Sequence, residues 1–573
     1  MAKAYVPVNR DQPMLMPVDK REWLADDHPV RLLIFLVERV LDTSAIEAGW
    51  ARLGGRGRAA YDPVMLTTLL LWAGLDAGEQ SCEKIVARCR RDVAYQYVCG
   101  EHVPDEDTVR RFRLHLFDRV AALEIEVLRL ASLAGLGDFS LAAVDGTKML
   151  AAASKKANRT EPTLTRLAEQ LAAEPGPPGL AGSSEPEPPA AGKPARVAAA
   201  LGQVRAERLA GEAADAARVA AYRARRAAGG PPGSAPRSIR LAEAEAQLAA
   251  LVARQEDKLA AWQAQRDAAF AAGRGGIRNP RPKVHDHYKV IKKRERVEQL
   301  RAESAQAPPS RRRGDGEPAP VANLTDPDSG LMPTTRGFVQ GYNCQAVATW
   351  DRLLVAGSCG RQTGDVAQAV PMLAAAEAAV ELFTATRQAA GFCCTCRHDQ
   401  PEPDRHTDPA EHARWRAGID SCELHHGLRI DWMLLDAGYL SEDNLTATGP
   451  PRLIALGKTR DVPAGDEPPT GPPDPEATAH ETNAHHLRTR DGRLAYRLRG
   501  HIAESPYGHL KHNKGLNRFH TRGLPTVTAE WTFIRTFHNL GIALHTIQTN
   551  RTNPHHLALL AETARQTTLS PAI

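Results

Sequence analysis

The sequence predicts an α/β protein with a helical N-terminal part and a long insertion within its α/β part. Three observations lead to this prediction: residues 20–135 carry apolar side chains at helical spacing, residues 140–145 and 337–359 read as strands, and the stretch between them is rich in Ala, Pro and Gly. The 573 residues are enough for two to four domains.

Composition excludes several classes of protein. Apolar residues make up 42% and charged residues 25% of the chain, an ordinary balance for a soluble globular protein. No run of 18 apolar residues occurs and the first fifteen residues lack a secretory core, so we expect a cytoplasmic protein without a membrane span. Nine cysteines are too sparse for a disulfide scaffold.

The N-terminal part is expected to be helical throughout. Apolar residues recur at helical spacing in 29–41, 63–75 and 107–133, with little of the alternation that marks strands. Pro104 is followed by three acidic residues, which is typical of a helix start.

Strands and helices then alternate along the chain. Residues 140–145 predict a short buried strand, 337–359 a hairpin, 366–383 an apolar helix, and 429–436 and 451–458 two more strands. This is the order of an α/β sheet.

Sections of different composition set the expected boundaries. Residues 170–240 are rich in Ala, Pro and Gly and are expected to be disordered at their start, whereas 238–272 predicts a long exposed helix. We expect a helical domain at 1–135, an α/β core at 136–160 and 321–550, an insertion at 161–320 that is disordered and then charged and helical, and a tail at 551–573.

Two aspartates follow apolar strands and precede a glycine at or near the turn. Asp145 ends the segment SLAAVD and Asp436 ends RIDWMLLD. Acidic side chains at the ends of adjacent strands converge in one crevice, where they can hold Mg²⁺ ions for phosphodiester chemistry. Either motif by itself is equally typical of a simple turn.

Glu504 is the only acid in a basic stretch, residues 493–522. It is either an ion-pair partner or a metal ligand among phosphate-binding groups. Lys511 is two helical turns away and would share its face, and Pro506 would suit the first turn of such a helix.

Five segments, in this order, resemble the DDE transposases of bacterial insertion sequences, in the group with a Tyr-Arg-Glu-Lys signature. Residues 61–113 resemble the N-terminal helical domain, 142–154 the first-Asp motif, and 325–347 the segment after a variable insertion. LLDAGYLSEDNL (434–445) resembles the second-Asp motif, and 496–544 the Glu motif with its C-terminal helices. Together they cover about two thirds of the chain.

The resemblance implies an RNase H-like catalytic core with Asp145, Asp436 and Glu504 as catalytic residues and metal ligands. It also implies that Tyr496, Arg499 and Lys511 act at the transposon-end DNA. Four residues separate Arg499 from Glu504, one more than in the best-known form of the signature, and the alternative arginine is Arg497. Further candidates for DNA contact are Arg518, Arg522, Arg110 and Arg111.

A zinc site and a basic segment are weaker hypotheses. Cys393, Cys396, Cys422 and His425 have spacings that allow a structural Zn²⁺, although incidental thiols in a loop are the alternative. Residues 278–313 hold twelve Lys or Arg against four acids, typical either of a solvated helix face or of non-specific DNA contact.

Several polar and aromatic residues of the core are expected to have structural roles. Asn343 and Gln345 are expected to serve the central sheet rather than DNA, and Asp351 and Asp365 to be turn and N-cap residues. Trp531 and Phe533 are expected to be core residues that pack against the Glu504 helix.

The sequence therefore predicts a transposase that uses two Mg²⁺ ions, with Mn²⁺ as a substitute, to cut DNA at terminal inverted repeats and join the ends to target DNA. We expect a dimer on paired DNA ends, associated with the bacterial nucleoid. The alternatives are a domesticated DNA-binding protein that no longer cuts and a metal-dependent nuclease without strand transfer.

Overall fold

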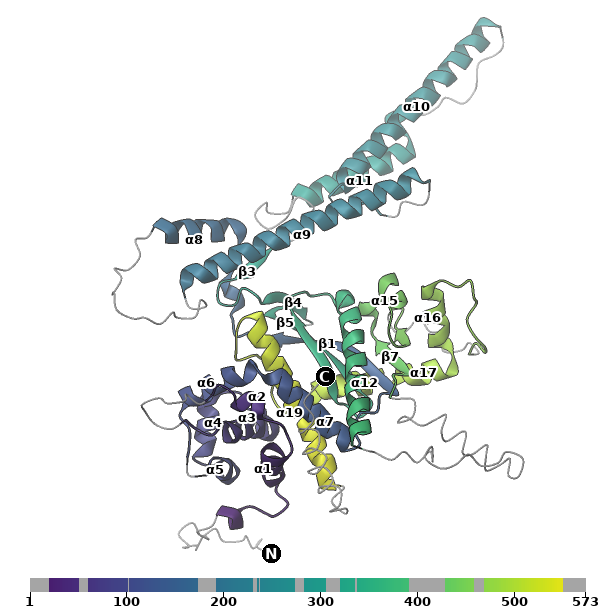
Figure 1. Ribbon diagram of the computed structural model, residues 1–573. Helices are drawn as coiled ribbons and strands as arrows, with labels where there is room; N and C mark the ends of the chain where they lie inside the picture. Colours follow the sequence, from purple (N-terminus) through teal and green to yellow (C-terminus); the bar gives the residue numbers. More distant parts are fainter. Residues whose placement is uncertain are drawn as a thin grey trace, which may run out of the picture. The chain divides into compact units, whose positions relative to one another are not determined.

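The structure is a computed structural model. It describes residues 20–50, 60–100, 102–173, 192–229, 234–236, 238–273, 283–305, 320–334, 337–390, 428–457 and 468–549. The chain forms two compact units: unit 1 is Met1–Lys155 with Asp328–Ile573, and unit 2 is Lys156–Pro327 (Figure 1).

Unit 1 begins with helices, as the apolar periodicity predicts. They are η1 (Lys20–Trp23), α1 (Pro29–Arg39), α2 (Ser44–Glu47), α3 (Pro63–Ala77), α4 (Cys82–Cys89), α5 (Val93–Cys99), α6 (Glu106–Phe117) and α7 (Val120–Leu133). Local signals set their ends: the Asp105 side chain accepts from the backbone N–H of Thr108 at the start of α6, and Gly78 ends α3 in the left-handed conformation. The stretch 107–133 is two helices, because Arg119 leaves helical geometry.

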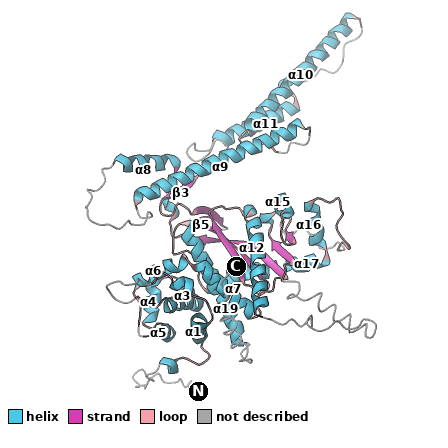
Figure 2. Ribbon diagram, in the orientation of Figure 1, coloured by secondary structure: helices cyan, strands magenta, loops and turns pink. Residues whose placement is uncertain are grey.

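The rest of unit 1 contains a mixed sheet and its covering helices. Its strands are β1 (Leu141–Leu150), β4 (Gly330–Thr334), β5 (Gly337–Thr349), β6 (Leu354–Gly360), β7 (Trp432–Leu435) and β8 (Arg452–Ile454). Its helices are η5 (Val366–Gln368), α12 (Ala369–Ala389), η6 (Ala437–Tyr439), α15 (Glu442–Thr446), α16 (Ala479–Arg488), α17 (Arg490–Arg497), α18 (Arg499–Gly508), the π-helical turn η8 (His509–Asn513) and α19 (Leu524–Thr549). The fold is therefore of the mixed α/β class (Figure 2).

Two kinds of strand pairing meet at β1. The strand order is β4-β5-β1-β7-β8, and β6 also pairs with β5. β5 is antiparallel to β1, β4 and β6, whereas β1, β7 and β8 are mutually parallel.

β1 is longer than the sequence indicated. The strand was expected to end at Asp145, but it continues for five more residues to Leu150. The prediction was wrong because the Asp-Gly pair was interpreted as a turn, whereas Gly146 to Leu150 continue the antiparallel ladder with β5. Asp145 lies instead where the parallel neighbour β7 ends.

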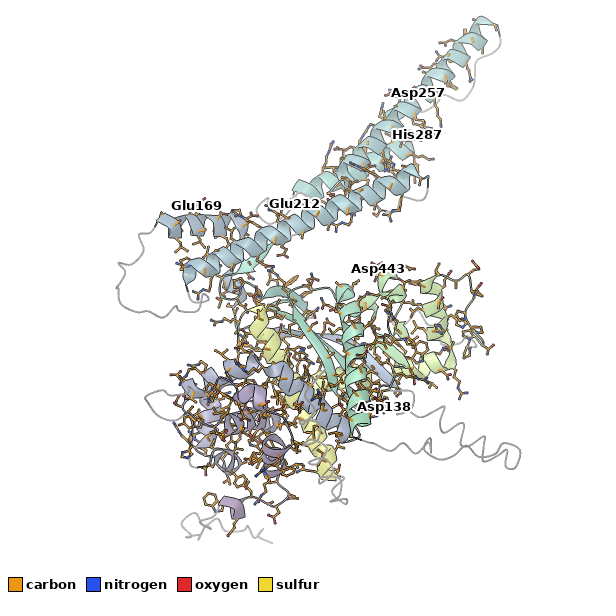
Figure 3. The ribbon with its side chains drawn as sticks, viewed as in Figure 1. Asp138, Glu169, Glu212, Asp257, His287 and Asp443 are labelled. Atoms are coloured by element: carbon orange, nitrogen blue, oxygen red, sulfur yellow. The ribbon has the colours of Figure 1, made fainter. Side chains whose placement is uncertain are left out.

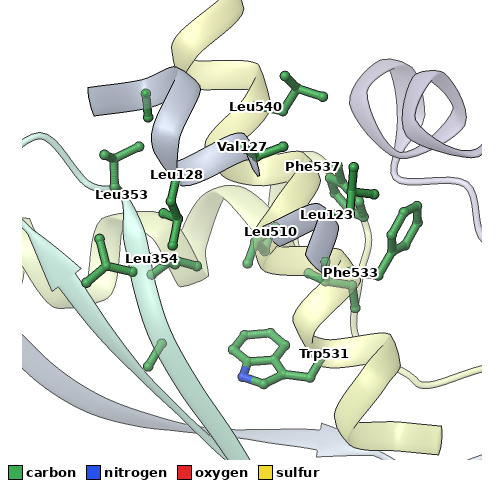
Figure 4. Close-up of a cluster of buried hydrophobic side chains, with 14 of the residues drawn as sticks. Leu123, Val127, Leu128, Leu353, Leu354, Leu510, Trp531, Phe533, Phe537 and Leu540 are labelled. Atoms are coloured by element: carbon green, nitrogen blue, oxygen red, sulfur yellow. The ribbon is translucent and has the colours of Figure 1, made fainter. Parts of the chain in front are cut away.

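The core of unit 1 joins the N-terminal helices, the sheet and the C-terminal helix. α19 packs on α7, α3 and β6, and α12 packs on α7 and β6. Figure 4 shows where α7 and α19 meet, with Leu123 and Val127 beside Phe537 and Leu540. Trp531 and Phe533 are both buried, and Trp531 stacks on Tyr507 of the Glu504 helix, as the sequence indicated for that ring.

Helix α12 is apolar enough to have been a candidate for spanning a membrane. Val366–Ala389 is the one described helix with the length and composition for it. Met372, Leu373, Ala376 and Phe383 are buried against the protein, which is how a core helix of an α/β sheet behaves.

Two asparagines complete the edges of the sheet. Asn539 of α19 donates to the carbonyl of Leu354 and accepts from its N–H, and Asn483 of α16 does the same for Ile454. The edge strands β6 and β8 thus have polar partners at these positions, which limits pairing with another chain.

Unit 2 is mostly helical. It contains η2 (Lys155–Ala157), β2 (Asn158–Thr160), α8 (Glu161–Ala173), α9 (Lys193–Ala227), α10 (Arg240–Ala271), η3 (Val284–Asp286), α11 (Tyr288–Ala305) and β3 (Val321–Asn323). The long helix expected at 238–272 is present as α10, and α10 packs on α11. α9 lies within the Ala-rich stretch, where alanine favours a helix more than the overall composition indicated.

Candidate active site

Asp145 and Asp436 lie at the same level of two neighbouring strands. Leu141, Ala142 and Ala143 of β1 pair in parallel with Trp432, Met433 and Leu434 of β7. Two residues further along each strand are Asp145 and Asp436, so this register brings the two carboxylates together. Asp436 caps η6 by accepting from the backbone N–H of Gly438 at 2.8 Å.

Glu504 reaches the same region from α18, and Arg499 lies between it and Asp145. One guanidinium nitrogen of Arg499, Nη1, is 3.8 Å from Oδ2 of Asp145, and the other, Nη2, is 3.6 Å from Oε1 of Glu504. The Glu504 side chain is two-thirds exposed, whereas those of Arg499 and Asp145 are about five-sixths buried. The structure thus places two predicted site residues, Asp145 and Glu504, next to the guanidinium of a third, Arg499.

Asp145 is electrostatically the most unusual of the acids. Its pKa is raised from 3.8 to about 6. Burial is the largest cause, Arg499 and the N–H of Gly146 oppose it, and the charges of Asp436 and Glu504 add to it. The nearby charge of Arg499 therefore does not fully offset the burial of the Asp145 carboxylate.

The donor set suits a hard divalent cation. Carboxylate oxygens are the ligands that Mg²⁺ prefers, and the Nη1 atom of Arg499, buried near Asp145, makes no hydrogen bond among the described residues. A cation would therefore meet an under-compensated buried carboxylate. Within the described ranges, however, no three acidic, His or Cys side chains are close enough to share one ion. In this structure the guanidinium provides the positive charge.

The Glu504 helix begins earlier than the sequence indicated. Pro506 was expected in its first turn, but α18 starts at Arg499 and Pro506 lies inside it. The prediction was wrong because Arg499 to Ala503 extend the helix before the proline. A π-helical turn, which carries Lys511, follows directly, and such turns frequently occur at functional sites.

The expected DNA-contacting residues of this segment are mostly bonded to the protein backbone. The Tyr496 hydroxyl donates to the carbonyl of Leu435 at 3.0 Å, and the Lys511 ammonium donates to that of Lys148 at 2.9 Å. Arg518 and Arg522 are exposed, and they donate to the carbonyls at positions 151 and 152, beyond β1. All four tie this segment to β1, to β7 or to the residues directly after β1.

The two N-terminal candidates, Arg110 and Arg111, are exposed on α6. Arg110 forms an ion pair with Asp107, and Arg111 donates to the carbonyl of Asp107 at 3.4 Å. The nearby Arg113 is buried and donates to the carbonyl of Gln80, which is a structural role.

A polar network beside Asp436 was not predicted as part of the site. Asp365 lies at the N-cap position of η5, as expected, but makes no cap hydrogen bond. Instead its Oδ1 accepts from the side-chain amides of Asn343 and Gln345 at 2.7 and 2.8 Å, and Gln345 accepts from the buried hydroxyl of Tyr439. No sequence signal links these residues, because they come from β5, η5 and η6.

Glycine is required where this network crosses β1. A Cβ atom at Gly146 would lie 2.5 Å from the Gln345 amide nitrogen and 3.1 Å from Asp365 Oδ1. The Asp-Gly pair is thus explained by a close approach of side chains and not by a turn. A Cβ at Gly438 would likewise be 3.0 Å from Asp436 and 3.5 Å from Asp365.

The zinc hypothesis concerns residues outside the described part. Cys393, Cys396, Cys422 and His425 all fall in the range 391–427. None of the cysteines that the structure describes forms a disulfide bond; they are Cys82, Cys89, Cys99, Cys344 and Cys359.

A separate cavity of about 1070 Å³ lies beside α18. It is lined by His501, Ser505 and His509 of this segment and by Trp72 and Trp350, among others. None of the three acids lines it, so the cavity is distinct from the acidic site.

Two protein-family models match the chain. A transposase domain (DUF772) matches residues 18–115, and a transposase DDE domain matches residues 473–542. The second match includes Glu504 and the residues tied to the strands, whereas Asp145 and Asp436 lie outside both. No curated protein and no solved structure matches the chain.

Helical transposase sequence at one end and DDE sequence at the other define a transposase, an enzyme class that acts on DNA. Both matches support an insertion-sequence DDE transposase. This agrees with the family that the ordered motifs indicated.

Proposed function

We propose that the protein cuts DNA at the ends of its insertion element and joins them to target DNA, with Asp145, Asp436 and Glu504 as the catalytic acids. The observation that carries the proposal is the convergence of the three acids: two lie level on parallel strands, and the third is bridged to the first by Arg499. The order of strand, hairpin, helix and parallel strands in unit 1 supports an RNase H-like core.

Divalent ions, Mg²⁺ or Mn²⁺, would activate the attacking oxygen and stabilise the leaving one. Asp145 and Asp436 would hold them from the sheet, and exposed Glu504 would complete the ligand set from α18. Arg499 neutralises Asp145 and Glu504 in this structure, and its charge suits a DNA phosphate once ions occupy the site.

The proposed DNA partners are the terminal repeats and the target duplex. Exposed Arg518, Arg522, Arg110 and Arg111 are available for phosphate contacts, and α11 adds a basic helix. The proposed organisation is a helical DNA-binding domain before the catalytic core, with the insertion as its own folded unit. Two copies of the chain would hold the two element ends as a dimer on DNA. The proposed location is the cytoplasm, at the nucleoid.

The test is cleavage and joining of a duplex that carries the two ends of the encoding element, with Mg²⁺ or Mn²⁺. Wild type should give cut and joined products, and Asp145→Ala, Asp436→Ala and Glu504→Ala should each lose at least about 100-fold in rate. Asp443→Asn, an exposed acid on α15, is the control (Figure 3).

Each other outcome rejects a part of the proposal. DNA that is bound but not cut by wild type would indicate a domesticated binding protein, and cut DNA without joined products would indicate a nuclease. Full activity in the three acid variants would reject the catalytic assignment.

A further inference from the structure

Two tyrosines of the segment that carries Glu504 donate hydrogen bonds to main-chain carbonyls of β1, which contains Asp145, and of β7, which Asp436 directly follows. We infer that Tyr507 and Tyr496 are positioning residues, which fix the Asp145 and Asp436 backbones relative to the Glu504 helix through hydrogen bonds to the carbonyls of Asp145 and Leu435. The inference rests on the proposed function and deepens it.

Tyr507 holds Asp145 itself. It lies three residues after Glu504 in α18, and its hydroxyl donates to the main-chain carbonyl of Asp145 at 2.7 Å. The ring is 8% exposed and stacks on Trp531, with centroids 6.3 Å apart and planes 19° apart. Trp531 in turn donates to the carbonyl of Gln345 at 3.0 Å. The Tyr507 ring is therefore held by Trp531, which is itself bonded to β5.

Tyr496 holds the residue before Asp436. It lies on α17, eight residues before Glu504, and donates to the Leu435 carbonyl at 3.0 Å. Leu435 ends β7, so Asp436 leaves the strand directly after this bond. A displacement of the Leu435 carbonyl would displace the aspartate with it.

The two bonds act at one level of the sheet. Because β1 and β7 are neighbours in parallel register, the carbonyls of Asp145 and Leu435 are close along the strands. The Lys511 ammonium adds a third bond between this segment and the sheet, to the Lys148 carbonyl of β1.

This role differs from contact with DNA, which the signature implies for Tyr496. A DNA-contacting side chain changes affinity for the duplex. A residue that sets the spacing between acids changes the rate of the chemical step, because small displacements of catalytic groups cost large factors in rate. The two roles therefore predict different kinetic parameters.

The experiment replaces Tyr507→Phe and Tyr496→Phe, which remove only the hydroxyl. Tyr61→Phe is a matched control, because its hydroxyl also donates to a main-chain carbonyl, that of Val103 at 3.1 Å, among the N-terminal helices. We expect kcat for cleavage of the element ends to fall about tenfold in both test variants, with KM and the Kd for DNA within about twofold of wild type. Tyr61→Phe should keep the wild-type kcat.

Hydrogen exchange on the metal-free protein gives a readout that does not need activity. Peptides that span 141–150 and 432–439 should exchange faster in Tyr507→Phe and Tyr496→Phe respectively, and at the wild-type rate in Tyr61→Phe. Unchanged exchange, or a kcat like that of the control, would overturn the inference. So would a Tyr496→Phe variant that loses DNA affinity at unchanged kcat.

Asp145→Asn separates this failure from failure of the proposed function. If Asp145→Asn abolishes cleavage while the tyrosine variants cleave like wild type, the inference fails and the function stands. If Asp145→Asn cleaves normally, the function and the inference built on it both fail.

Discussion

Asp145 shows how burial can change the charge state of a side chain. It is held largely out of water by β1, β5 and α18, and its nearest positive charge is 3.8 Å away. Because a carboxylate prefers water or a close cation, the fold makes its ionised form costly.

The pH dependence of stability tests this environment. Because burial raises the folded-state pKa of Asp145 from 3.8 to about 6, the folded protein binds this proton more tightly than the unfolded chain does. The contribution to stability is therefore present below the unfolded pKa and is lost as the pH rises through about 6. Relative to Asp145→Asn, wild type without metal should lose about 2 kcal/mol of unfolding free energy between pH 4 and pH 7.

Urea unfolding in a chelator at several pH values measures this difference. Asp443→Asn, which removes an exposed carboxylate, should follow wild type at every pH. A constant difference between wild type and Asp145→Asn would show that the carboxylate is not desolvated.

Two polar residues near the acids have backbone partners that the sequence does not reveal. Lys511 and Tyr496 match the signature, and both are half-buried and bonded to strand carbonyls. Burial lowers the pKa of Lys511, which is what desolvation does to an ammonium. The signature residues thus hold the segment in place in this structure, whatever they contact when DNA is bound.

At the scale of elements, α19 joins the sheet to the N-terminal helices. Its Arg535 is 3% exposed and forms an ion pair with Glu124 of α7, with Nη1 and Oε1 2.5 Å apart. The same side chain crosses β6 at Gly357, where a Cβ would lie 2.7 Å from Arg535 Nε. A buried pair at this junction fixes α7, α19 and β6 in one arrangement.

Removing one partner of this pair should be strongly destabilising. Glu124→Ala leaves a buried guanidinium without its counter-ion, and the unfolding free energy should fall by about 3 to 5 kcal/mol. The double variant Glu124→Leu with Arg535→Met removes both charges and should recover most of that loss. Urea denaturation of the three proteins measures it, and equal losses in the single and double variants would contradict the expectation.

At the scale of the whole molecule, the chain is two units with separate cores. Unit 2 has small clusters of its own, one around Leu164 and Val204 and another around Val297 and Leu300. Its two ends come together, because Thr160 pairs with Val321 in the β2–β3 ladder. The charged Glu169, Glu212 and Asp257 lie along its helices (Figure 3).

Unit 2 should therefore be removable. Replacement of residues 161–320 by a short Gly-rich turn joins the paired positions Thr160 and Val321, as in a hairpin. We expect the thermal unfolding of unit 1 to persist, because its core contains no residue of unit 2. DNA affinity should become less salt-dependent, since the basic helix α11 is lost. Circular dichroism and DNA titrations at several salt concentrations measure both, and a chain that no longer folds would refute the expectation.

The sequence by itself determined the class of fold, the family and the order of the motifs. Periodicity gave the helices, apolar runs gave the strands that carry Asp145 and Asp436, and a lone acid in a basic stretch marked Glu504. These are local patterns, and local patterns report the preferences of neighbouring residues.

The tertiary structure decided what surrounds each candidate. It extended β1 beyond Asp145, started α18 before Pro506, and placed Arg499 between two acids. It also brought Asp365, Gln345 and Tyr439 together beside Asp436. Such contacts join residues tens to hundreds of positions apart, and burial alters their charge states. They depend on which strands pair and which helices cover them, so no local pattern could predict them.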